Sequence, residues 1–166
     1  LASKILGIVL TKRSNGAASN VELAGFPHHS LETYLPKLVS AGCRVAVCDQ
    51  LEDPKRAKGI VKRGITELVT PGLSLNDNVL ESKKNNFLAS VYSSKENYGV
   101  SFLDISTGEF SLCDCSYDQL EKLIYTYNPS EIICSKSDKD FINSKFNTNN
   151  VFGIDDWIYK IGYSYD

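Results

Sequence analysis

Residues 24–72 hold the feature that most constrains how this 166-residue chain can fold, because helix, strand and turn signals follow one another there without a gap. Five apolar side chains recur at the i, i+3, i+4, i+7, i+8 spacing of an amphipathic helix: Leu31, Tyr34, Leu35, Leu38 and Val39. Ser30 is a suitable N-cap, and Gly42 closes the segment. Pro36 lies inside it, so we expect a bend or a restart of the helix there.

Two strands are predicted after this helix. Arg44–Leu51 carries a near-continuous apolar run, which is typical of a strand covered on both faces. Ile60–Thr70 is a second strand, interrupted near Gly64 and stopped by Pro71-Gly72. Glu52–Gly59, which contains a proline and a glycine, is the loop between them.

The first twenty residues are predicted to hold the end of a helix, one strand and a loop. Leu1–Leu6 is the helix end, and Ile8–Leu10 is a buried strand that ends at Lys12-Arg13. Ser14–Asn20 is rich in Ser, Asn, Gly and Ala and is predicted to be a loop. Since a helix is already under way at the first residue, we expect further sequence upstream.

The second half of the chain predicts an α/β layer fold, because strands and helices alternate in it. The expected order is strand, hairpin, helix, strand, helix and a last aromatic segment: 87–92, 98–106 with 109–113, 117–127, 131–134, 137–146 and 151–163. We therefore divide the chain into two small α/β domains, residues 1–72 and 87–166, joined by a polar linker of residues 73–86.

Charge is distributed unevenly between the two halves. Residues 1–70 hold ten Lys and Arg against six Asp and Glu, whereas residues 71–166 hold eight against fourteen, within a total of −2. Five positive charges fall within nine residues: Lys55, Arg56, Lys58, Lys62 and Arg63. Such a cluster supplies salt-dependent affinity for phosphates, but a solvated basic loop shows the same pattern. The sequence does not decide whether the first three of these side chains face a nucleic acid.

Several other classes of site are disfavoured by the composition. The five cysteines are predicted to be buried free thiols, and Cys113-x-Cys115 lacks the further ligands that a zinc site needs. We therefore expect no metal and no cofactor in these residues. No apolar run approaches the roughly 18 residues of a membrane span. No G-x-x-x-x-G-K-[ST] phosphate loop occurs, so these residues are not expected to form an enzyme that hydrolyses ATP.

A series of short motifs in fixed order resembles the signature of the bacterial MutS family, which recognises mismatched DNA. The motifs are Gly25-Phe26-Pro27-His28-His29, Glu32–Val39, Val45–Leu51, Asp53–Gly59 and Val69–Gly72. His28 is a departure, because the family usually carries tyrosine there. Phe102–Phe110 is similar to the hairpin of the RNase H-like connector domain of that family. The resemblance implies a mixed-sheet α/β mismatch-recognition domain, N-terminally truncated, followed by an incomplete RNase H-like connector domain.

The resemblance also implies which residues contact DNA. Arg13 and Arg63, with their neighbours Lys12 and Lys62, are expected on the DNA side of the first domain. Leu23, which is usually methionine in the family, is expected to approach the minor groove. The function implied is DNA mismatch recognition in mismatch repair, with this chain supplying backbone contacts and the connector.

Family members read a mismatch with a Phe-x-Glu motif, whose phenylalanine wedges into the minor groove at a mispaired step that bends easily. No Phe-x-Glu occurs in this sequence, and the resemblance places it upstream of Leu1. Phe26 precedes Pro27 in a turn and is predicted to pack in the core. We therefore expect this chain alone to bind DNA weakly, without distinguishing matched from mismatched duplexes.

The remaining expectations concern the longer protein that the resemblance implies. ATP, magnesium and the homodimer contact belong to its far C-terminal domain, and its connector domain binds the MutL partner. We expect it in the bacterial cytoplasm, associated with the nucleoid and with no membrane.

Two alternatives stay open from the residues alone. In an RNase H-like nuclease, Asp104 would bind a catalytic metal together with acids such as Glu109, Asp114 or Asp155-Asp156. A pure protein-interaction module is the other alternative, because the second half is rich in tyrosine.

Overall fold

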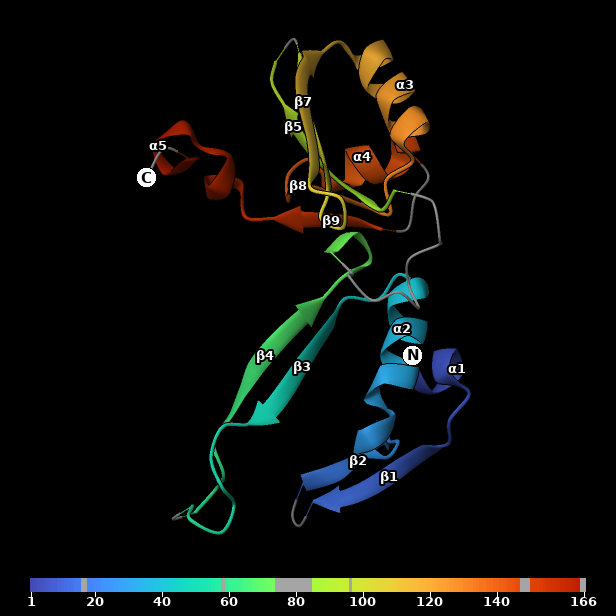
Figure 1. Ribbon diagram of the computed structural model, residues 1–166, viewed down its shortest axis with the longest axis vertical. Coiled ribbons are helices and arrows are strands. Elements are labelled where there is room, and N and C mark those ends of the chain that lie inside the picture. Colours follow the sequence, from blue (N-terminus) through green and yellow to red (C-terminus); the bar gives the residue numbers. More distant parts are fainter. Residues whose placement is uncertain (16–17, 58, 74–84, 96, 147–149, 165–166) are drawn as a thin grey trace. The chain divides into compact units, whose positions relative to one another are not determined.

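The computed structural model describes residues 1–15, 18–57, 59–73, 85–95, 97–146 and 150–164 (Figure 1). They form two compact units, Leu1–Val69 and Thr70–Asp166. Both are α/β, which confirms the predicted fold class of two small α/β domains. The second unit begins at Thr70, shortly before the linker expected from residue 73, and most of that linker, residues 74–84, lies outside the described residues.

The first unit contains two separate two-stranded antiparallel sheets, β1-β2 and β3-β4. Its elements are α1 (Ala2–Leu6), β1 (Leu10–Asn15), β2 (Ala18–Ala24), the 3-10 helix η1 (His28–Ser30), α2 (Leu31–Ser40), β3 (Val45–Gln50) and β4 (Arg63–Val69). Gly7 ends α1 in the left-handed conformation, at φ 66°. Helix α2 runs through Pro36 without a break, so no restart occurs there.

The start of the first unit differs from the prediction. Residues 8 and 9 lie outside any strand, and β1 begins at Leu10 and includes Lys12-Arg13. The predicted buried strand is wrong, since Leu10 is 50% exposed. The predicted loop Ser14–Asn20 is also wrong, because β1 extends to Asn15 and β2 begins at Ala18. Ala, Ser and Asn have little strand propensity of their own. The start of β2 is therefore a strand because it pairs with β1.

Strand β3 is covered on one face only. Val45 and Val47 are half-buried on the face towards α2, whereas Ala46 and Cys48 are exposed on the other. The prediction of a strand covered on both faces is therefore wrong for the described residues. In α2, by contrast, the predicted apolar stripe is confirmed, with Leu35 and Val39 buried.

The second unit is built on a five-stranded mixed sheet of order β7-β6-β5-β8-β9, in which β5, β6 and β7 are antiparallel and β5, β8 and β9 are parallel. Its elements are the 3-10 helix η2 (Pro71–Leu73), β5 (Phe87–Ser93), β6 (Tyr98–Asp104), β7 (Glu109–Cys115), α3 (Tyr117–Tyr127), β8 (Glu131–Ser135), α4 (Lys139–Phe146), β9 (Val151–Ile154), η3 (Asp156–Tyr159) and α5 (Ile161–Ser164). The strands and helices predicted for this half are present, although the last aromatic segment is a strand only up to Ile154.

One face of this sheet and the helices α3 and α4 form the core of the second unit. Alternate residues of β5 (Phe87, Ala89 and Val91) are buried there, as the two-residue period of a strand requires. Leu120 of α3 and Ile142 of α4 are fully buried against them. A capping box at Ser116 starts α3, and Asn128 ends it in the left-handed conformation.

All five cysteines are free thiols. Cys115 and Cys134 are buried as predicted, but Cys48 and Cys113 are exposed, which corrects the expectation that all are buried. Cys48 lies on the uncovered face of the β3-β4 sheet, and Cys113 lies on β7, an edge strand.

Candidate nucleic-acid interface

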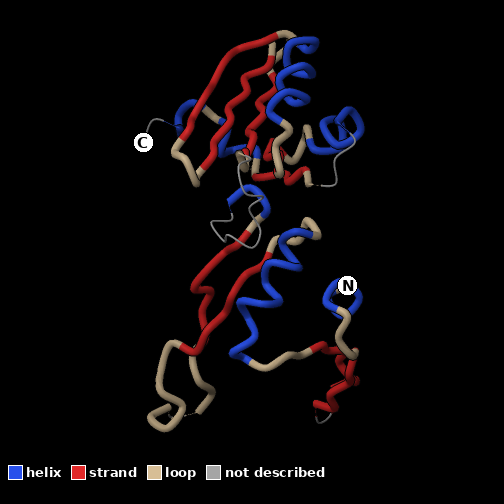
Figure 2. Tube along the Cα trace, turned by 45° about the vertical axis from the view of Figure 1, so that its right-hand side comes forward, coloured by secondary structure: helices blue, strands red, loops and turns tan. Residues whose placement is uncertain are grey.

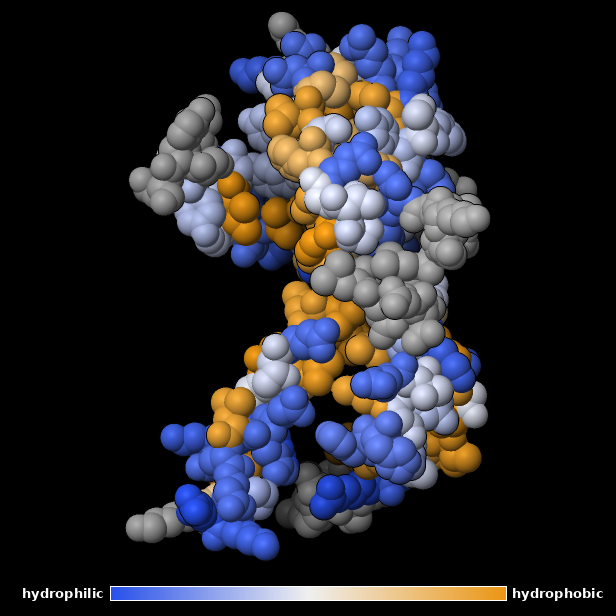
Figure 3. Space-filling view, viewed as in Figure 1, coloured by the Kyte–Doolittle hydropathy of each residue, from blue (hydrophilic) through white to orange (hydrophobic). Residues whose placement is uncertain are grey.

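The strands and the loop that carry the predicted DNA-contact residues lie at one end of the first unit, the end at which α2 begins. The β1-β2 sheet and the loop that joins β3 to β4 both reach this end (Figures 1 and 2). We call residues 51–62 the basic loop; residue 58 lies outside its described part. Strongly hydrophilic residues are prominent at this end of the space-filling view (Figure 3), although the basic loop also exposes Leu51 and Ile60. The unit therefore presents basic side chains from two separate sheets at the same end.

The register of the β1-β2 sheet sorts the predicted residues onto two faces. Lys12 lies opposite Glu22, and Thr11 lies opposite Leu23. Because side chains alternate along a strand, Arg13 shares its face with Leu23 and not with Lys12. Leu23 is 39% exposed, and its carbonyl accepts a hydrogen bond of 3.1 Å from the Thr11 hydroxyl. One face thus combines a cation with an accessible apolar side chain, while Lys12 shares the other face with Glu22.

The basic residues of the second sheet lie where the β3-β4 pairing ends. Arg63, the first residue of β4, is exposed and pairs with Gln50. One step further, the Leu51 N–H donates to the carbonyl of Lys62 over 2.9 Å. The Lys62 N–H donates in turn to Oε1 of Glu52 over 2.7 Å. The Glu52 side chain therefore supplies the acceptor that a continued strand would otherwise provide, and it closes the root of the basic loop.

A short turn begins the basic loop. Oδ1 of Asp53 accepts a hydrogen bond of 2.9 Å from the Lys55 N–H, and the Arg56 N–H donates to the Asp53 carbonyl over 2.9 Å. The Arg56 side chain is 89% exposed, and its Nε lies 4.0 Å from Oδ2 of Asp53. An ion pair this long and exposed contributes little to stability. The turn instead determines the local path of the loop.

The sequence did not predict the roles of Glu52 and Asp53 at this end, although Asp53 begins the motif Asp53–Gly59. The only signal for them was two acidic residues directly before a basic run, which is also common in solvated loops. Leu51 completes the root, because its side chain lies across Gly64. A Cβ at position 64 would stand 2.8 Å from Cδ1 of Leu51, so a larger residue there would displace the end of this exposed side chain.

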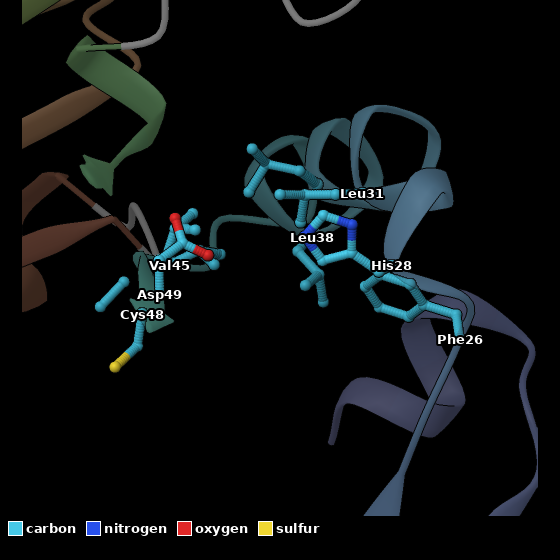
Figure 4. Close-up of a pocket in the computed structure, with 10 residues that line it drawn as sticks. Phe26, His28, Leu31, Leu38, Val45, Cys48 and Asp49 are labelled. Carbon is cyan, nitrogen blue, oxygen red and sulfur yellow. The ribbon is translucent and has the colours of Figure 1, made fainter. Parts of the chain in front are cut away.

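A groove with a volume of about 300 Å³ separates α2 from β3 within the first unit. Its lining is largely apolar and includes Phe26, Leu31 and Leu38 (Figure 4). The Asp49 carboxylate is directed towards the helix side of the groove and accepts a hydrogen bond of 3.0 Å from Thr66. Phe26 stacks on Tyr34 with 4.6 Å between ring centroids. Phe26 therefore packs against α2 at the groove, but it is only half-buried, so the prediction that it packs in the core is wrong.

In the second unit, the Asp104 carboxylate is fully buried and already has donors around it. It accepts hydrogen bonds from the Ser106 N–H (2.9 Å), the Ser106 hydroxyl (2.6 Å) and the Asn86 N–H (3.1 Å). Burial raises the pKa of Asp104, but these hydrogen bonds and one from the Thr107 backbone outweigh it and lower the pKa below its ordinary value. The carboxylate therefore ties the β6-β7 hairpin to the start of β5.

The geometry gives the nuclease alternative no support. Within the described residues, no three His, Cys, Asp or Glu side chains gather closely enough to hold a metal ion. Of the acids that were considered together with Asp104, Glu109 accepts a hydrogen bond from Asn85, and Asp155 pairs with Lys136.

Many tyrosines of the second unit pack against neighbouring rings. Tyr127 stacks on Phe102 at 4.1 Å between centroids, and Tyr98 meets Tyr117 at 6.0 Å. Tyr125 is 74% exposed, and Tyr165 lies outside the described residues.

In the part of the chain that the structure describes, no helix is both long enough and apolar enough to cross a membrane.

Comparison with known proteins relates both units to one family. The profile of MutS domain I matches residues 1–78, and that of MutS domain II matches residues 86–156. The DNA mismatch repair protein MutS of Flavobacterium psychrophilum is 58% identical over 164 residues, which cover 98% of this chain and 19% of the relative. Those of Cytophaga hutchinsonii (55% over 166 residues, 99% and 19%) and Porphyromonas gingivalis (59% over 161 residues, 96% and 18%) are similarly close. The chain spans about a fifth of the length of these curated relatives.

Proposed function

The chain belongs to the MutS family of DNA mismatch repair proteins, and we propose that its first unit binds the DNA backbone while its second unit connects that unit to the rest of a longer repair protein. The observation that carries the proposal is the exposure of Lys12, Arg13, Lys62 and Arg63 at one end of the first unit. Arginine and lysine side chains neutralise phosphates and release counterions from duplex DNA.

The proposed contact has a sequence-independent part and a groove-directed part. Arg13 and Arg63 neutralise phosphates, which positions the duplex but carries no information about base sequence. Leu23 shares the Arg13 face and is accessible, so it is the apolar side chain that would approach the minor groove. Because the sequence contains no Phe-x-Glu, the chain alone binds matched and mismatched duplexes with similar affinity.

Family membership supports further proposals about the longer protein. ATP and magnesium act outside these 166 residues, since the sequence contains no phosphate loop. The longer protein forms a homodimer, signals to MutL through a surface that includes the second unit, and works in the cytoplasm at the nucleoid. The chain itself binds DNA without cleaving it.

Titration of a labelled duplex with this chain tests the proposed function. Replacement of both arginines (R13A/R63A) removes two phosphate contacts, so the slope of log K against log salt falls by about 1.8 in magnitude. The matched control is K95A/K122A, which removes two exposed positive charges from the second unit. The control slope is expected to stay near that of the unmodified chain.

Three results would contradict the proposal. Equal slopes for R13A/R63A and for the unmodified chain would show that neither arginine meets a phosphate. A preference of about tenfold for a mismatched over a matched duplex would show that this chain discriminates without Phe-x-Glu. Cleavage of the duplex in magnesium or manganese, abolished by D104N, would restore the nuclease alternative.

A further inference from the structure

We propose that Glu52 is a positioning residue for DNA binding: its carboxylate holds the root of the basic loop so that the cations beside it meet the phosphates. This inference rests on the proposed function. Glu52 is acidic, and from its charge alone it would be expected to repel DNA.

The contact that supports this role lies at the end of the β3-β4 pairing. Gln50 and Arg63 are the last paired residues, and the Leu51 N–H still donates to the Lys62 carbonyl over 2.9 Å. Beyond that bond no strand continues, and the Lys62 N–H donates to Oε1 of Glu52 over 2.7 Å. Hydrogen bonds from a backbone N–H to an ionised carboxylate are shorter and stronger than neutral ones. Glu52 thus fixes the backbone that carries Lys62 and sets the direction in which Arg63 enters β4.

Leu51 and Gly64 form the rest of the root. Leu51 can lie flat across position 64 because glycine has no side chain there. In the described residues between Asp53 and Val61, the hydrogen bonds that order the loop are those of the root and of the local turn at Asp53. Without the Glu52 bond, the loop ends have one fewer constraint and the loop samples more conformations. DNA binding must then order it, which weakens association.

Two opposing effects of removing Glu52 allow a decisive test. Removal of one negative charge near the phosphates tightens DNA binding by about twofold if charge alone matters. Loss of the hydrogen bond that orders the root weakens it by about fivefold if positioning matters. Because the two effects have opposite signs, the direction of the change identifies the role of Glu52.

The experiment compares E52A, E52Q and E67A by duplex titration at one low salt concentration. Glu67 is an exposed carboxylate on the same sheet, so E67A controls for the loss of charge. Glutamine at position 52 keeps an acceptor oxygen for the Lys62 N–H but removes the charge. We expect E52A to bind about fivefold more weakly, while E52Q and E67A bind as the unmodified chain or slightly more tightly.

Amide hydrogen exchange at Lys62 gives a second readout that does not involve DNA. Exchange at this amide is expected to be faster in E52A and unchanged in E52Q. Binding by E52A that equals or exceeds that of E52Q would overturn the role of Glu52, provided that R63A weakens binding. If R63A binds as tightly as the unmodified chain, the proposed function itself is wrong. The two failures are therefore distinguishable.

Discussion

Replacement of Asp104 by alanine is predicted to destabilise the second unit strongly, because the buried carboxylate holds two chain segments together. It accepts bonds from the N–H groups of Ser106 and Asn86 and from the Ser106 hydroxyl. The hydroxyl can turn to water, but the two backbone N–H groups are partly buried and would lose their acceptor. Each such loss costs about 1 to 2 kcal/mol, so D104A should lower the free energy of unfolding by about 2 to 4 kcal/mol.

The milder variant D104N separates hydrogen bonding from charge. Its amide oxygen keeps one acceptor, so we expect it to lose about half as much stability as D104A. Hydrogen bonds lower the pKa of Asp104 in the folded protein. The stabilisation by the ionised carboxylate is therefore complete above about pH 4, the ordinary aspartate pKa, and is lost as the pH falls through the lower folded value. The difference between the unmodified chain and D104N should shrink over that range.

Urea unfolding followed by tryptophan fluorescence measures this effect, because Trp157 is the only tryptophan of the sequence and lies in the second unit. With a slope of about 1 kcal/mol per molar urea, D104A should move the midpoint down by about 2 M or more. Circular dichroism of the same samples confirms that D104N is folded at the start. A D104A midpoint equal to that of the unmodified chain would refute the structural role of this carboxylate.

Two further predictions concern the core of the second unit and its thiols. Ile142 is fully buried against the sheet, so I142A should lower the free energy of unfolding by about 2 to 4 kcal/mol in the same titration, whereas L112A, at a side chain that is 72% exposed, should change it little. An equal effect of the two would contradict the described core. Burial raises the pKa of Cys134 to about 11, so a thiol reagent at mildly alkaline pH should label Cys48 quickly and Cys134 only after unfolding. Fast labelling of Cys134 in the native protein would show that β8 is not buried.

The sequence predicted the second unit better than the first, because the apolar residues of the second unit are buried by helices of the same unit. Phe87, Ala89 and Val91 alternate with less buried residues, and the helices that cover them follow in the same unit. In the first unit the run Val45–Cys48 has the composition of a strand covered on both faces, yet α2 covers only one of them. Composition describes which residues favour burial, and it does not identify the element that buries them.

The candidate interface was predictable in its residue types but not in its arrangement. A cluster of Lys and Arg can be recognised from the sequence alone, and its affinity for phosphate follows from its charge. The role of Glu52 depends on where the pairing of β3 with β4 stops, at Gln50 and Arg63, and a bulge between Val47 and Cys48 shifts that register. No periodic pattern in the sequence indicates such a shift. The residue that closes the loop therefore became visible only with the strand pairing.

Strand geometry also divides the predicted DNA-contact residues into those that can act together and those that cannot. Lys12 and Arg13 are neighbours in sequence, but alternation directs them to opposite faces of the β1-β2 sheet. A duplex that meets Arg13 and Leu23 on one face leaves Lys12 on the other, opposite Glu22. The negative charge of Glu22 then partly cancels the long-range attraction between Lys12 and DNA. Arg13, in contrast, can approach a phosphate directly. Under the proposed function, the phosphate contact of this sheet is therefore expected on the Arg13 face, whereas charge counting alone weights the two residues equally.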